Sequence, residues 1–290
     1  MPWKAGSRRA PTWKGASALA LAAALLLAAC TSSPSRTTAG LTDPAPATPP
    51  AAPGNWHLAF SDEFQGSSLD TSRWTTCYDW NQNGCTNEAN HELEWYQPGQ
   101  ATVADGSLTL TAGRKTVKGT DGHTYPWTSG MVSTGRSNWY ATPRFTLTYG
   151  YVEASIRFPA EPGMFPAFWM MPQTRFVPPE IDIAEQFGDA RTVRMTLHYP
   201  GPNQTDLAQY TQFGPRDFTS GFHTYAVDWE PSSLTWYIDG VQRFRITNPK
   251  VIPDTPMEVL LTLAVGYPQA PPADVDSGQM VVNWVRVWQH

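Results

Sequence analysis

Within residues 54–290, several segments place apolar side chains at every second position, and no stretch keeps the 3.6-residue apolar period of an amphipathic helix. The alternation is clearest at 145–158, FTLTYGYVEASIRF, where Gly150 indicates a bulge or a close backbone approach. Asp239-Gly240 separates two such runs and predicts a type I′ hairpin. Turn residues recur at short intervals, and the chain has 27 prolines. This pattern predicts an all-β chain, folded as a two-sheet antiparallel sandwich.

The segment EIDIAE, which begins at Glu180, crowds three carboxylates into six residues of a chain that is only 16% charged. In a strand, Glu180 and Asp182 face one side, and the isoleucines between them face the core. Glu185 lies an odd number of residues from Glu180, so a regular strand would turn it inward, where an unpaired carboxylate is costly. One extra residue in the strand would turn Glu185 to the same face as Glu180. We therefore predict a β-bulge at Ile183-Ala184 that brings all three acids to one face.

Acids in one row suit the hydrolysis of a glycoside with retention of configuration. One carboxylate attacks the anomeric carbon, and another, about 5–5.5 Å away, protonates the leaving oxygen and later activates water. An acid between them keeps a neighbour protonated by like-charge repulsion and can orient the nucleophile. A solvated strand face or a cation site would give the same pattern, but the apolar neighbours FPAFWMMP and LHYP favour catalysis.

The chain has 13 tryptophans, which is a high count. Aromatic faces stack on the C–H faces of sugar rings, so some of the tryptophans are expected to form an open platform. For any single tryptophan the core is the better interpretation, and Trp284 and Trp288 are expected there.

EIDIAE resembles the E-x-D-x-x-E signature of glycoside hydrolase family 16, in the bulged form of its laminarinase-like members. The resemblance extends over almost all of residues 54–290. Its segments, in family order, are WHLAFSDEF (56–64), HELEWY (91–96), TSGMVST (128–134), YGYVEASIRFP (149–159), GMFPAFWMMP (163–172), TLHYP (196–200), FHTYAVDWEPSSLTWYIDG (222–240), LLTLAVG (260–266) and VVNWVRVWQ (281–289). The resemblance implies a β-jelly roll with a long concave substrate cleft.

The resemblance also assigns roles to particular side chains. It implies that the three acids are the nucleophile, its helper and the general acid/base: Glu180, Asp182 and Glu185 respectively. It places four more side chains in the cleft: Asn90, Arg136, Trp169 and His198. Trp169 is the best sugar platform among them, while His198 would hydrogen-bond near the nucleophile's strand or serve a purely structural role. Phe165 stands where the family usually has tryptophan, which leaves the subsite preference open.

Many members of the family bind a structural Ca²⁺ through an aspartate in the final strand. The matching residue is Asn283, whose carbonyl oxygen can still ligate but carries less charge, with backbone oxygens of Glu63 and Gly106 completing the set. We leave this calcium open. Residues 79–84, DWNQNG, copy the first half of an EF-hand loop, but the twelfth position is Asn90, so an Asn/Gly-rich loop is favoured. The six histidines show no metal-ligand spacing, and no cofactor is expected in catalysis.

The first 29 residues have the pattern of a bacterial export signal. Four basic residues precede an apolar run at about 16–29, which is shorter than the roughly 20 residues needed to cross a bilayer; a buried core helix is the alternative. The run ends in Leu-Ala-Ala-Cys30, which resembles the lipobox of bacterial lipoproteins, in which the cysteine is lipidated. Residues 30–53, rich in Thr, Ser, Pro and Ala, would form a flexible tether. Residues 54–290 remain as one catalytic domain.

The three cysteines fit export. If Cys30 carries lipid, Cys77 and Cys85 remain, and because disulfides persist outside the cytosol we predict a bridge between them, with two free thiols as the alternative. Loss of residues 1–29 removes four basic and no acidic residues, so the formal net charge falls from −5 to −9. Nucleic acid is therefore not expected as a partner.

These features together predict an exported endo-β-glucanase, either tethered to the bacterial surface or secreted. It would cleave β-1,3 or mixed β-1,3-1,4 glucan with retention, act as a monomer, and contact the membrane only through Cys30. A hydrolase of galactan, agar or carrageenan, or a transglycosylase, is the alternative with the same fold; position 165 and the loops at 78–90 and 114–127 would decide. The three acids argue against a non-catalytic glucan-binding lipoprotein.

Overall fold

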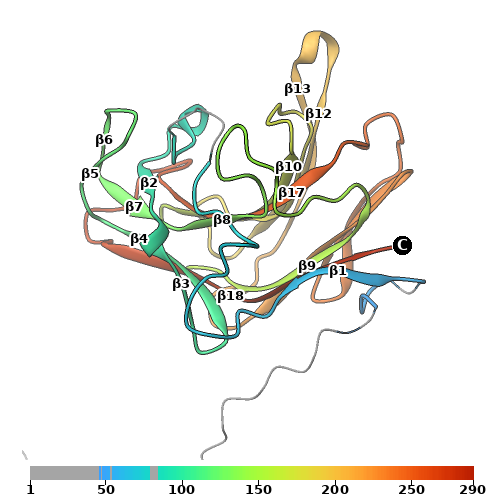
Figure 1. Ribbon diagram of the computed structural model, residues 1–290, viewed down its shortest axis with the longest axis horizontal. Helices are drawn as coiled ribbons and strands as arrows, with labels where there is room; N and C mark the ends of the chain where they lie inside the picture. The colour runs from blue at the N-terminus through green and yellow to red at the C-terminus, as the bar shows by residue number, and fades with distance from the viewer. Residues whose placement is uncertain (1–45, 47, 53, 79–83) are drawn as a thin grey trace, which may run out of the picture. The chain divides into compact units, whose positions relative to one another are not determined.

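The computed structural model describes residues 46, 48–52, 54–78 and 84–290 of the chain. The predicted export signal, Cys30 and most of the predicted tether lie outside the described residues. The described part contains two large β-sheets that pack face to face (Figure 1), as the alternation predicted. Among its residues, none belong to a helix long and apolar enough to cross a bilayer.

The larger sheet has ten strands, in the order β16-β15-β14-β9-β18-β4-β7-β2, with β1 paired to β18 and β3 to β4. The strands are β1 (His57–Asp62), β2 (Glu94–Tyr96), β3 (Ala101–Ala104), β4 (Ser107–Gly113), β7 (Trp127–Ser129), β9 (Gly150–Arg157), β14 (His223–Glu230), β15 (Ser233–Ile238), β16 (Val241–Ile246) and β18 (Ser277–Gln289). Among the described strands every pair is antiparallel except β2 and β7, which run parallel.

The smaller sheet has six strands, in the order β13-β12-β11-β10-β17-β8. They are β8 (Met131–Ser133), β10 (Met164–Pro172), β11 (Glu180–Glu185), β12 (Val193–Pro200), β13 (Asp206–Phe213) and β17 (Met257–Val265). A short ribbon of β5 (Val117–Lys118) and β6 (Thr124–Tyr125) and three 3₁₀ turns, η1 (Glu88–Asn90), η2 (Pro98–Gln100) and η3 (Pro202–Gln204), complete the described elements.

The two-residue period places alternate side chains in the core between the sheets. In β4, Leu108, Leu110 and Ala112 are fully buried, while the residues between them are half-buried. β10 and β17 are buried along their whole length because each of their faces is covered. One face meets the main core, and the other carries a second apolar cluster on the side of the smaller sheet that is turned away from the larger one: Tyr78, Tyr96, Met131, Ala167, Trp169, Met171 and Leu260.

Two backbone predictions are confirmed at glycines. Asp239 and Gly240 both have positive φ, 53° and 70°, as a type I′ turn between β15 and β16 requires. Gly150 has φ 139°, and a Cβ there would lie 2.5 Å from the carbonyl oxygen of Trp288. However, β9 begins only at Gly150: the alternating residues before it do not form a strand, and there Leu147 makes an isolated bridge to Met257.

The outer face of the larger sheet is covered by the start of the described chain. The indole of Trp288 donates a hydrogen bond to the carbonyl oxygen of Pro46 (2.9 Å), and Ala52 is buried beside it. Trp56 stacks on the imidazole of His290, with ring centroids 3.8 Å apart. Pro46 and Ala52, which lie inside the segment predicted as a flexible tether, therefore pack on the sheet.

Of the two tryptophans predicted in the core, Trp288 is confirmed as fully buried, whereas Trp284 is not. Trp288 is buried under the N-terminal segment rather than between the sheets. Trp284 is only half-buried, and the guanidinium of Arg286 lies over its ring at 4.0 Å. β18 has a register shift between Val282 and Trp284, which changes the face that this part of the strand presents.

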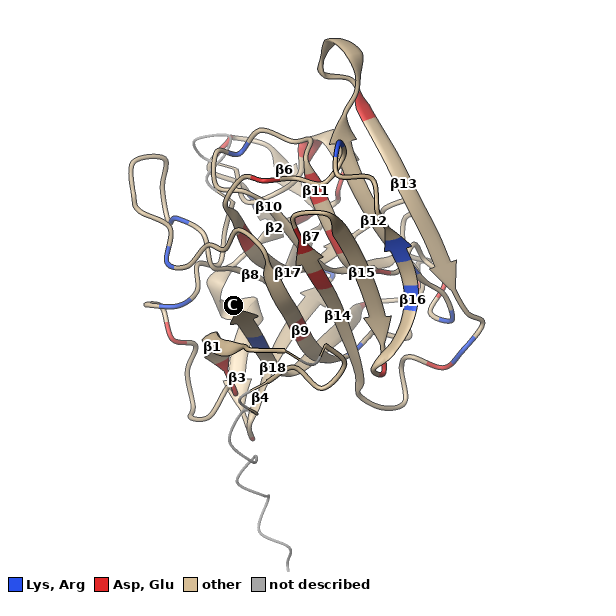
Figure 2. Cartoon of the chain, turned by 90° about the vertical axis from the view of Figure 1, so that its right-hand side faces the viewer, with Lys and Arg blue, Asp and Glu red and all other residues tan. Residues whose placement is uncertain are grey.

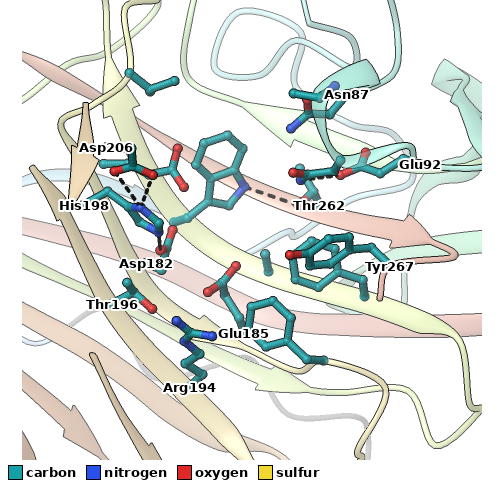
Figure 3. Close-up of a pocket in the computed structure, with 18 of the residues that line it drawn as sticks. Asn87, Glu92, Asp182, Glu185, Arg194, Thr196, His198, Asp206, Thr262 and Tyr267 are labelled. Atoms are coloured by element: carbon teal, nitrogen blue, oxygen red, sulfur yellow. Dashed lines mark hydrogen bonds and ion pairs between the residues drawn. The ribbon is translucent and has the colours of Figure 1, made fainter. Parts of the chain in front are cut away.

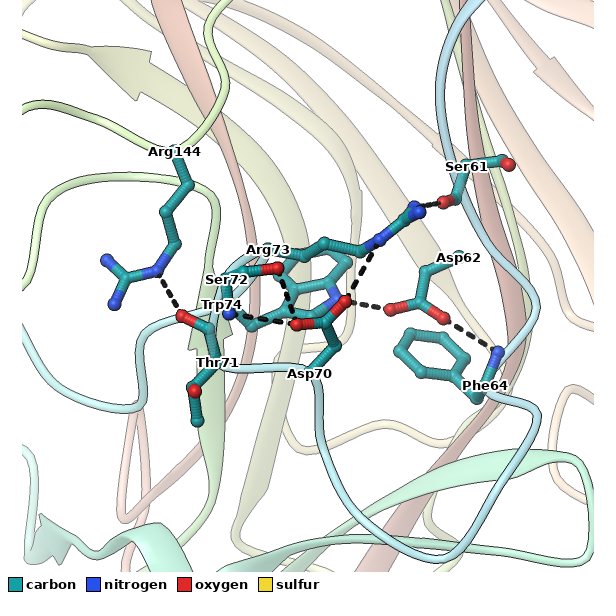
Figure 4. A network of polar contacts seen from close by, with 9 residues as sticks. All are labelled: Ser61, Asp62, Phe64, Asp70, Thr71, Ser72, Arg73, Trp74 and Arg144. Carbon is teal, nitrogen blue, oxygen red and sulfur yellow. Dashed lines mark hydrogen bonds and ion pairs between the residues drawn. The ribbon is translucent and has the colours of Figure 1, made fainter.

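The loop that follows β1 is held by a polar network (Figure 4). The carboxylate of Asp62 accepts hydrogen bonds from the backbone N–H of Phe64 (2.8 Å) and from the indole of Trp74 (2.7 Å). Arg144, far along the chain, donates to the carbonyl oxygen of Thr71 at 2.8 Å. The loop leads directly to Cys77, and the predicted Cys77–Cys85 disulfide is confirmed.

Candidate active site

A cleft with a volume of about 480 Å³ lies on the face of the smaller sheet that is turned away from the larger sheet (Figure 3). Its floor comes from β10, β11, β12 and β17, because alternate residues of these strands point away from the core. Its walls come from the segment that follows the disulfide, from the loops after β10 and β17, and from the start of β13. The row of three acids predicted on β11 lines this cleft: Glu180, Asp182 and Glu185.

The predicted bulge is present in β11. On β12, Asp182 pairs with Thr196 and Glu185 with Arg194, so two residues of β11 stand opposite one residue of β12. Those two residues, Ile183 and Ala184, are both buried in the core. The extra residue restores the parity that the sequence lacks, and all three acids face the cleft.

The bulge also sets the spacing of the outer two acids. Glu180 pairs with His198 and Glu185 with Arg194, which are four residues apart on β12. Four pairing positions correspond to about 13 Å between Cα atoms. The side chains of the two glutamates must therefore lean toward each other over Asp182 for both to act on one glycosidic bond, which needs carboxyl groups about 5–5.5 Å apart in a retaining site.

Burial and mutual repulsion govern the charge of this row. Asp182 is 1% exposed and Glu185 is 8% exposed. Burial, followed by the negative charges of Asp182 and Glu180, raises the pKa of Glu185 well above its usual range, against the opposing charge of Arg194. Burial and then Asp182 likewise raise the pKa of Glu180, where His198 opposes the shift. The row therefore keeps a proton at a pH at which an ordinary glutamate has lost it.

His198 lies beside the row, as the resemblance implied. Its Nε2 is 3.4 Å from the Oδ2 of Asp182, and its Nδ1 is 2.9 Å from the Oδ2 of Asp206. Burial lowers the pKa of His198, but hydrogen bonding to Asp182, the charges of Asp182 and Glu180, and the bond to Asp206 outweigh it and raise that pKa to about 9. His198 is therefore a cation at neutral pH.

The other predicted cleft residues are distributed as follows. Asn90 lines the cleft, and its amide donates to the Oε1 of Glu92 at 3.0 Å. Trp169 also lines it, with its indole N–H held by Thr262 at 3.2 Å. Arg136 is absent from the described lining residues; its guanidinium lies over the ring of Trp139 at 4.6 Å.

Phe165 belongs to an aromatic group at the cleft. Its ring centroid lies 5.0 Å from that of Phe187 and 5.1 Å from that of Tyr267, and all three residues line the cleft. Phe187 and Tyr267 follow β11 and β17 in loops, so the sequence pattern did not single them out. Together they supply apolar surface beside a residue that is smaller than the family's usual tryptophan.

Sequence reasoning also missed a second pair of acids, Glu92 and Glu94, both buried. The backbone N–H of Val265 donates to the Oε2 of Glu94 at 2.7 Å, and Glu92 lines the cleft. Burial raises the pKa of both, and the charge of Glu92 raises that of Glu94 further. A signal for this pair was available, because HELEWY places two acids two residues apart, as EIDIAE does with Glu180 and Asp182.

Arg175 is a further cleft residue without a sequence signal. It lies in the loop after β10, and its guanidinium forms a buried ion pair with Glu258 of β17. A Cβ at Gly135 would overlap the carboxylate of Glu258, so the residue at that position must be glycine while this ion pair stands.

The residues predicted for calcium come together but do not suit the ion. The carbonyl oxygen of Glu63 accepts from the amide of Gln65 (3.1 Å), which also lies against Gly106, and the Oδ1 of Asn283 accepts from Ser107 (3.2 Å). The two carboxylate oxygens of Glu63 each accept a hydrogen bond from the guanidinium of Arg286. Calcium prefers six to eight oxygens that include carboxylates. None of the three predicted oxygens carries a charge, and those of Glu63 and Asn283 already accept hydrogen bonds, so the set does not fit calcium well.

Within the part of the chain that the structure describes, two other groups bring three ligand atoms within 4.8 Å of one another. One is Glu88, Asp121 and His123, of which Asp121 is half-buried, and it can offer carboxylate and imidazole ligands to a cation. The other is Glu180, Asp182 and His198, but a protonated imidazole donates hydrogen bonds and has no lone pair for a metal. In the EF-hand-like segment, residues 79–83 lie outside the described residues.

Comparisons with known proteins agree with this geometry. Residues 87–286 match the sequence profile of glycosyl hydrolases family 16. The endo-1,3-1,4-beta-glycanase EglC of Rhizobium meliloti (strain 1021) is 34% identical over 79% of this chain and 51% of its own length. The beta-glucanase of Rhodothermus marinus is 30% identical over 81% of this chain and 86% of its own. The chain spans about half the length of the Rhizobium glycanases that it matches.

Solved structures resemble the fold over the same region. The endo-beta-1,3-glucanase from Pyrococcus furiosus has a TM-score of 0.70 and 29% identity, over 81% of this chain and 94% of its own. The laminarinase catalytic domain from Thermotoga maritima MSB8 has a TM-score of 0.70 and 27% identity, over 81% of this chain and 98% of its own.

Proposed function

Because the chain belongs to glycosyl hydrolases family 16, we propose that it is an endo-β-glucanase that cleaves β-1,3 or mixed β-1,3-1,4 glucan with retention of configuration. The observation that carries the proposal is the row of three acids on the bulged strand β11, at the floor of a cleft. Relatives whose names specify β-1,3 or β-1,3-1,4 linkages support the choice of substrate.

In the first step, the carboxylate of Glu180 attacks the anomeric carbon while Glu185 gives its proton to the glycosidic oxygen. The bond to the leaving sugar breaks, and a covalent glycosyl-enzyme forms. In the second step, Glu185, now ionised, takes a proton from water, which attacks the same carbon and releases Glu180. Two inversions give net retention. The raised pKa of Glu185 suits this cycle, because the acid must hold its proton until the glycosidic bond breaks.

The charges around the row suit a division of roles. The cation at His198 lies at the Glu180 end, where it favours the negative charge that a nucleophile needs. Asp182 stands between the two glutamates, where it can orient Glu180 and repel a negative charge on Glu185. Sugar rings would stack on the aromatic surface of Trp169 and of the group that contains Phe165.

Two substitutions test the roles separately. Glu180→Gln should abolish the release of reducing sugar from laminarin and from mixed-linkage glucan. Glu185→Gln should lower kcat on these substrates by about 10²–10⁴-fold, yet still form the glycosyl-enzyme from an aryl glycoside whose leaving group needs no proton. The exposed Glu161→Gln is the control. A Glu180→Gln enzyme with wild-type activity would refute the assignment of the nucleophile.

Retention itself is read by ¹H NMR of the first product formed. The β-anomer should appear before mutarotation, and an initial α-anomer would exclude the two-step mechanism. A panel that adds galactan, agar and carrageenan to the glucans would reveal a different glycan specificity.

We also propose that the mature protein is exported and held at the membrane through lipidated Cys30. The support is the short apolar run followed by Leu-Ala-Ala-Cys. Because residues from Pro46 onward pack on the outer face of the larger sheet, a tether would leave from the side opposite the cleft. Labelling with a fatty-acid analogue tests the anchor: Cys30→Ser should lose the label, and an unlabelled wild-type protein would contradict it.

A further inference from the structure

The two-step mechanism gives no role to Asp206, which begins β13 and lines the cleft beside His198 (Figure 3). Both of its carboxylate oxygens reach the Nδ1 of His198, at 3.0 and 2.9 Å. The other ring nitrogen of His198 faces Asp182, at 3.4 Å. The imidazole is thus held between two carboxylates that come from the strands on either side of its own.

This arrangement has a definite protonation state. A neutral imidazole has one N–H donor and one acceptor nitrogen, whereas an ionised carboxylate only accepts. A neutral His198 would therefore turn a lone pair toward one of the carboxylates, whereas the imidazolium presents an N–H to both, hydrogen-bonded to Asp206 and ion-paired with Asp182. The charged groups that face the ring are Asp182 and Glu180 from β11 and Asp206 from β13, all acidic. Although burial lowers the pKa of His198, these groups raise it to about 9.

The hairpin of β12 and β13 brings Asp206 to this position. It projects beyond the rest of the sheet (Figure 2), and its turn is closed by hydrogen bonds between Gly201 and Thr205 and between Thr205 and Pro202. In the register, His198 pairs with Ala208, so Asp206 is its diagonal neighbour on the same face. A residue in that diagonal position lies about 7–8 Å away, within reach of a long or ring side chain.

We propose that Asp206 is a positioning residue that keeps His198 cationic and directs its Nε2–H toward Asp182 while Glu180 forms the glycosyl-enzyme. The inference rests on the proposed function, since it assigns a task within that reaction. With both carboxylates ionised, the group Asp182–His198–Asp206 carries a net charge of −1. It can therefore favour the positive charge that develops on the sugar ring in the transition state, while the imidazolium supports the ionised nucleophile.

The test removes the negative charge of Asp206 and keeps the shape of its side chain. Asp206→Asn retains an oxygen that can accept from Nδ1–H but removes the negative charge. Asp206→Glu is the conservative rescue. The chain offers a matched control in Asp239, which holds the Nδ1 of His223 at 2.9 Å in the β15–β16 turn, away from the cleft. Asp239→Asn suits the left-handed backbone of that turn and removes a similar His–Asp pair.

The primary readout is the titration of His198, followed by long-range ¹H–¹⁵N NMR of the imidazole and assigned with His198→Gln. Loss of an opposite charge at hydrogen-bond distance should lower the pKa of His198 by about one unit or more in Asp206→Asn. Asp206→Glu should restore most of the shift, and Asp239→Asn should leave His198 unchanged. This readout needs no substrate, so it stands even if the glucanase proposal fails.

The second readout is the pH profile of kcat/KM on an aryl β-glycoside of the sugar that the enzyme cleaves, because kcat/KM reports the pKa values of the free enzyme, as the substrate-free titration does. A good leaving group needs no proton from Glu185, so the loss of rate at high pH then reports the loss of the His198 cation. That cation is present below its pKa and disappears as the pH rises through it. The alkaline limb of Asp206→Asn should therefore move to lower pH by the same amount as the NMR titration, with little change in KM.

Three results would overturn the inference. An unchanged His198 titration in folded Asp206→Asn would show that another group keeps the imidazole charged. A shifted titration with an unchanged pH profile would separate the cation from the reaction. A loss of rate that is equal at every pH, or a raised KM alone, would mean that Asp206 contacts the glucan directly or only supports the hairpin.

Discussion

Glu153 offers a sharp test of the energetics of this fold, because it is an acid buried without a strong partner. It lies on β9, on the outer face of the larger sheet, and is 2% exposed. Its Oε2 is buried without a hydrogen-bond partner, and the nearby Arg286 is already held at 2.8 Å by both oxygens of Glu63. The variant Glu153→Gln keeps the size of the side chain and removes the charge.

The size of the stability difference between the wild type and Glu153→Gln follows from the pKa of Glu153. Burial raises the pKa of Glu153 from 4.5 to about 7, with Arg286 opposing the shift. Below pH 4.5 the side chain is neutral in both the folded and the unfolded chain, and its charge has no effect. As the pH rises toward 7 the unfolded chain ionises first, so the wild type loses stability relative to the glutamine variant. At 1.36 kcal/mol per pKa unit, the loss reaches about 3 kcal/mol above pH 7.

Urea unfolding of both proteins at pH 4.5 and pH 8 measures this difference. We expect near-equal free energies of unfolding at pH 4.5 and a variant that is more stable by up to about 3 kcal/mol at pH 8, or several degrees in Tm. Acid effects elsewhere in the chain cancel, because both proteins share them. The exposed Glu161→Gln should show no such dependence on pH. A Glu153→Gln advantage that is the same at both pH values would refute the assignment of a charged, poorly compensated Glu153.

Other parts of the fold give further expectations. Deletion of residues 46–52 should lower stability by about 1.5–3 kcal/mol, since it uncovers the large side chain of Trp288, and should leave kcat unchanged; urea unfolding and initial rates check both. Reduction of the Cys77–Cys85 bridge should lower stability by about 2–4 kcal/mol and raise KM, because the bridge closes a wall of the cleft; a reduced protein with unchanged KM would contradict this. Chelation with EDTA should leave Tm unchanged, because Asn283 and its neighbours do not suit calcium; a fall in Tm that calcium reverses would show that they do.

Much of the site followed from counting along the chain. A strand has a period of two, so the odd interval between Glu180 and Glu185 required one extra residue, and the small Ala184 marked where it could fit. HELEWY offered a similar cue, two acids two residues apart, although only Glu94 of this pair lies in β2. Features that depend only on residues within one strand were thus accessible from the sequence.

Contacts between distant segments were not accessible in this way. Asp206 reaches His198 because a hairpin of a particular length pairs β13 with β12, and Arg175 reaches Glu258 because a loop folds over β17. A local sequence pattern predicts neither the register in which two strands pair nor the path of a loop. The same limit applies to the segment predicted as a tether: Pro, Ala and Thr are typical of a flexible segment, but Pro46 and Ala52 pack on apolar surface that only the folded sheet provides.

The larger sheet also takes part in the site, although none of its core residues enters the cleft. Trp236 on β15 is fully buried, and its indole N–H donates to the carbonyl oxygen of Asp182 at 2.9 Å. That carbonyl comes immediately before the bulge, where the regular pairing of β11 with β12 is interrupted. Because a buried carbonyl without a partner costs about 1–3 kcal/mol, the indole stabilises the bulged backbone against a return to regular pairing. Trp236 of the opposite sheet therefore stabilises the bulge that turns Glu185 into the cleft. The position of the acids thus depends on the packing between the two sheets.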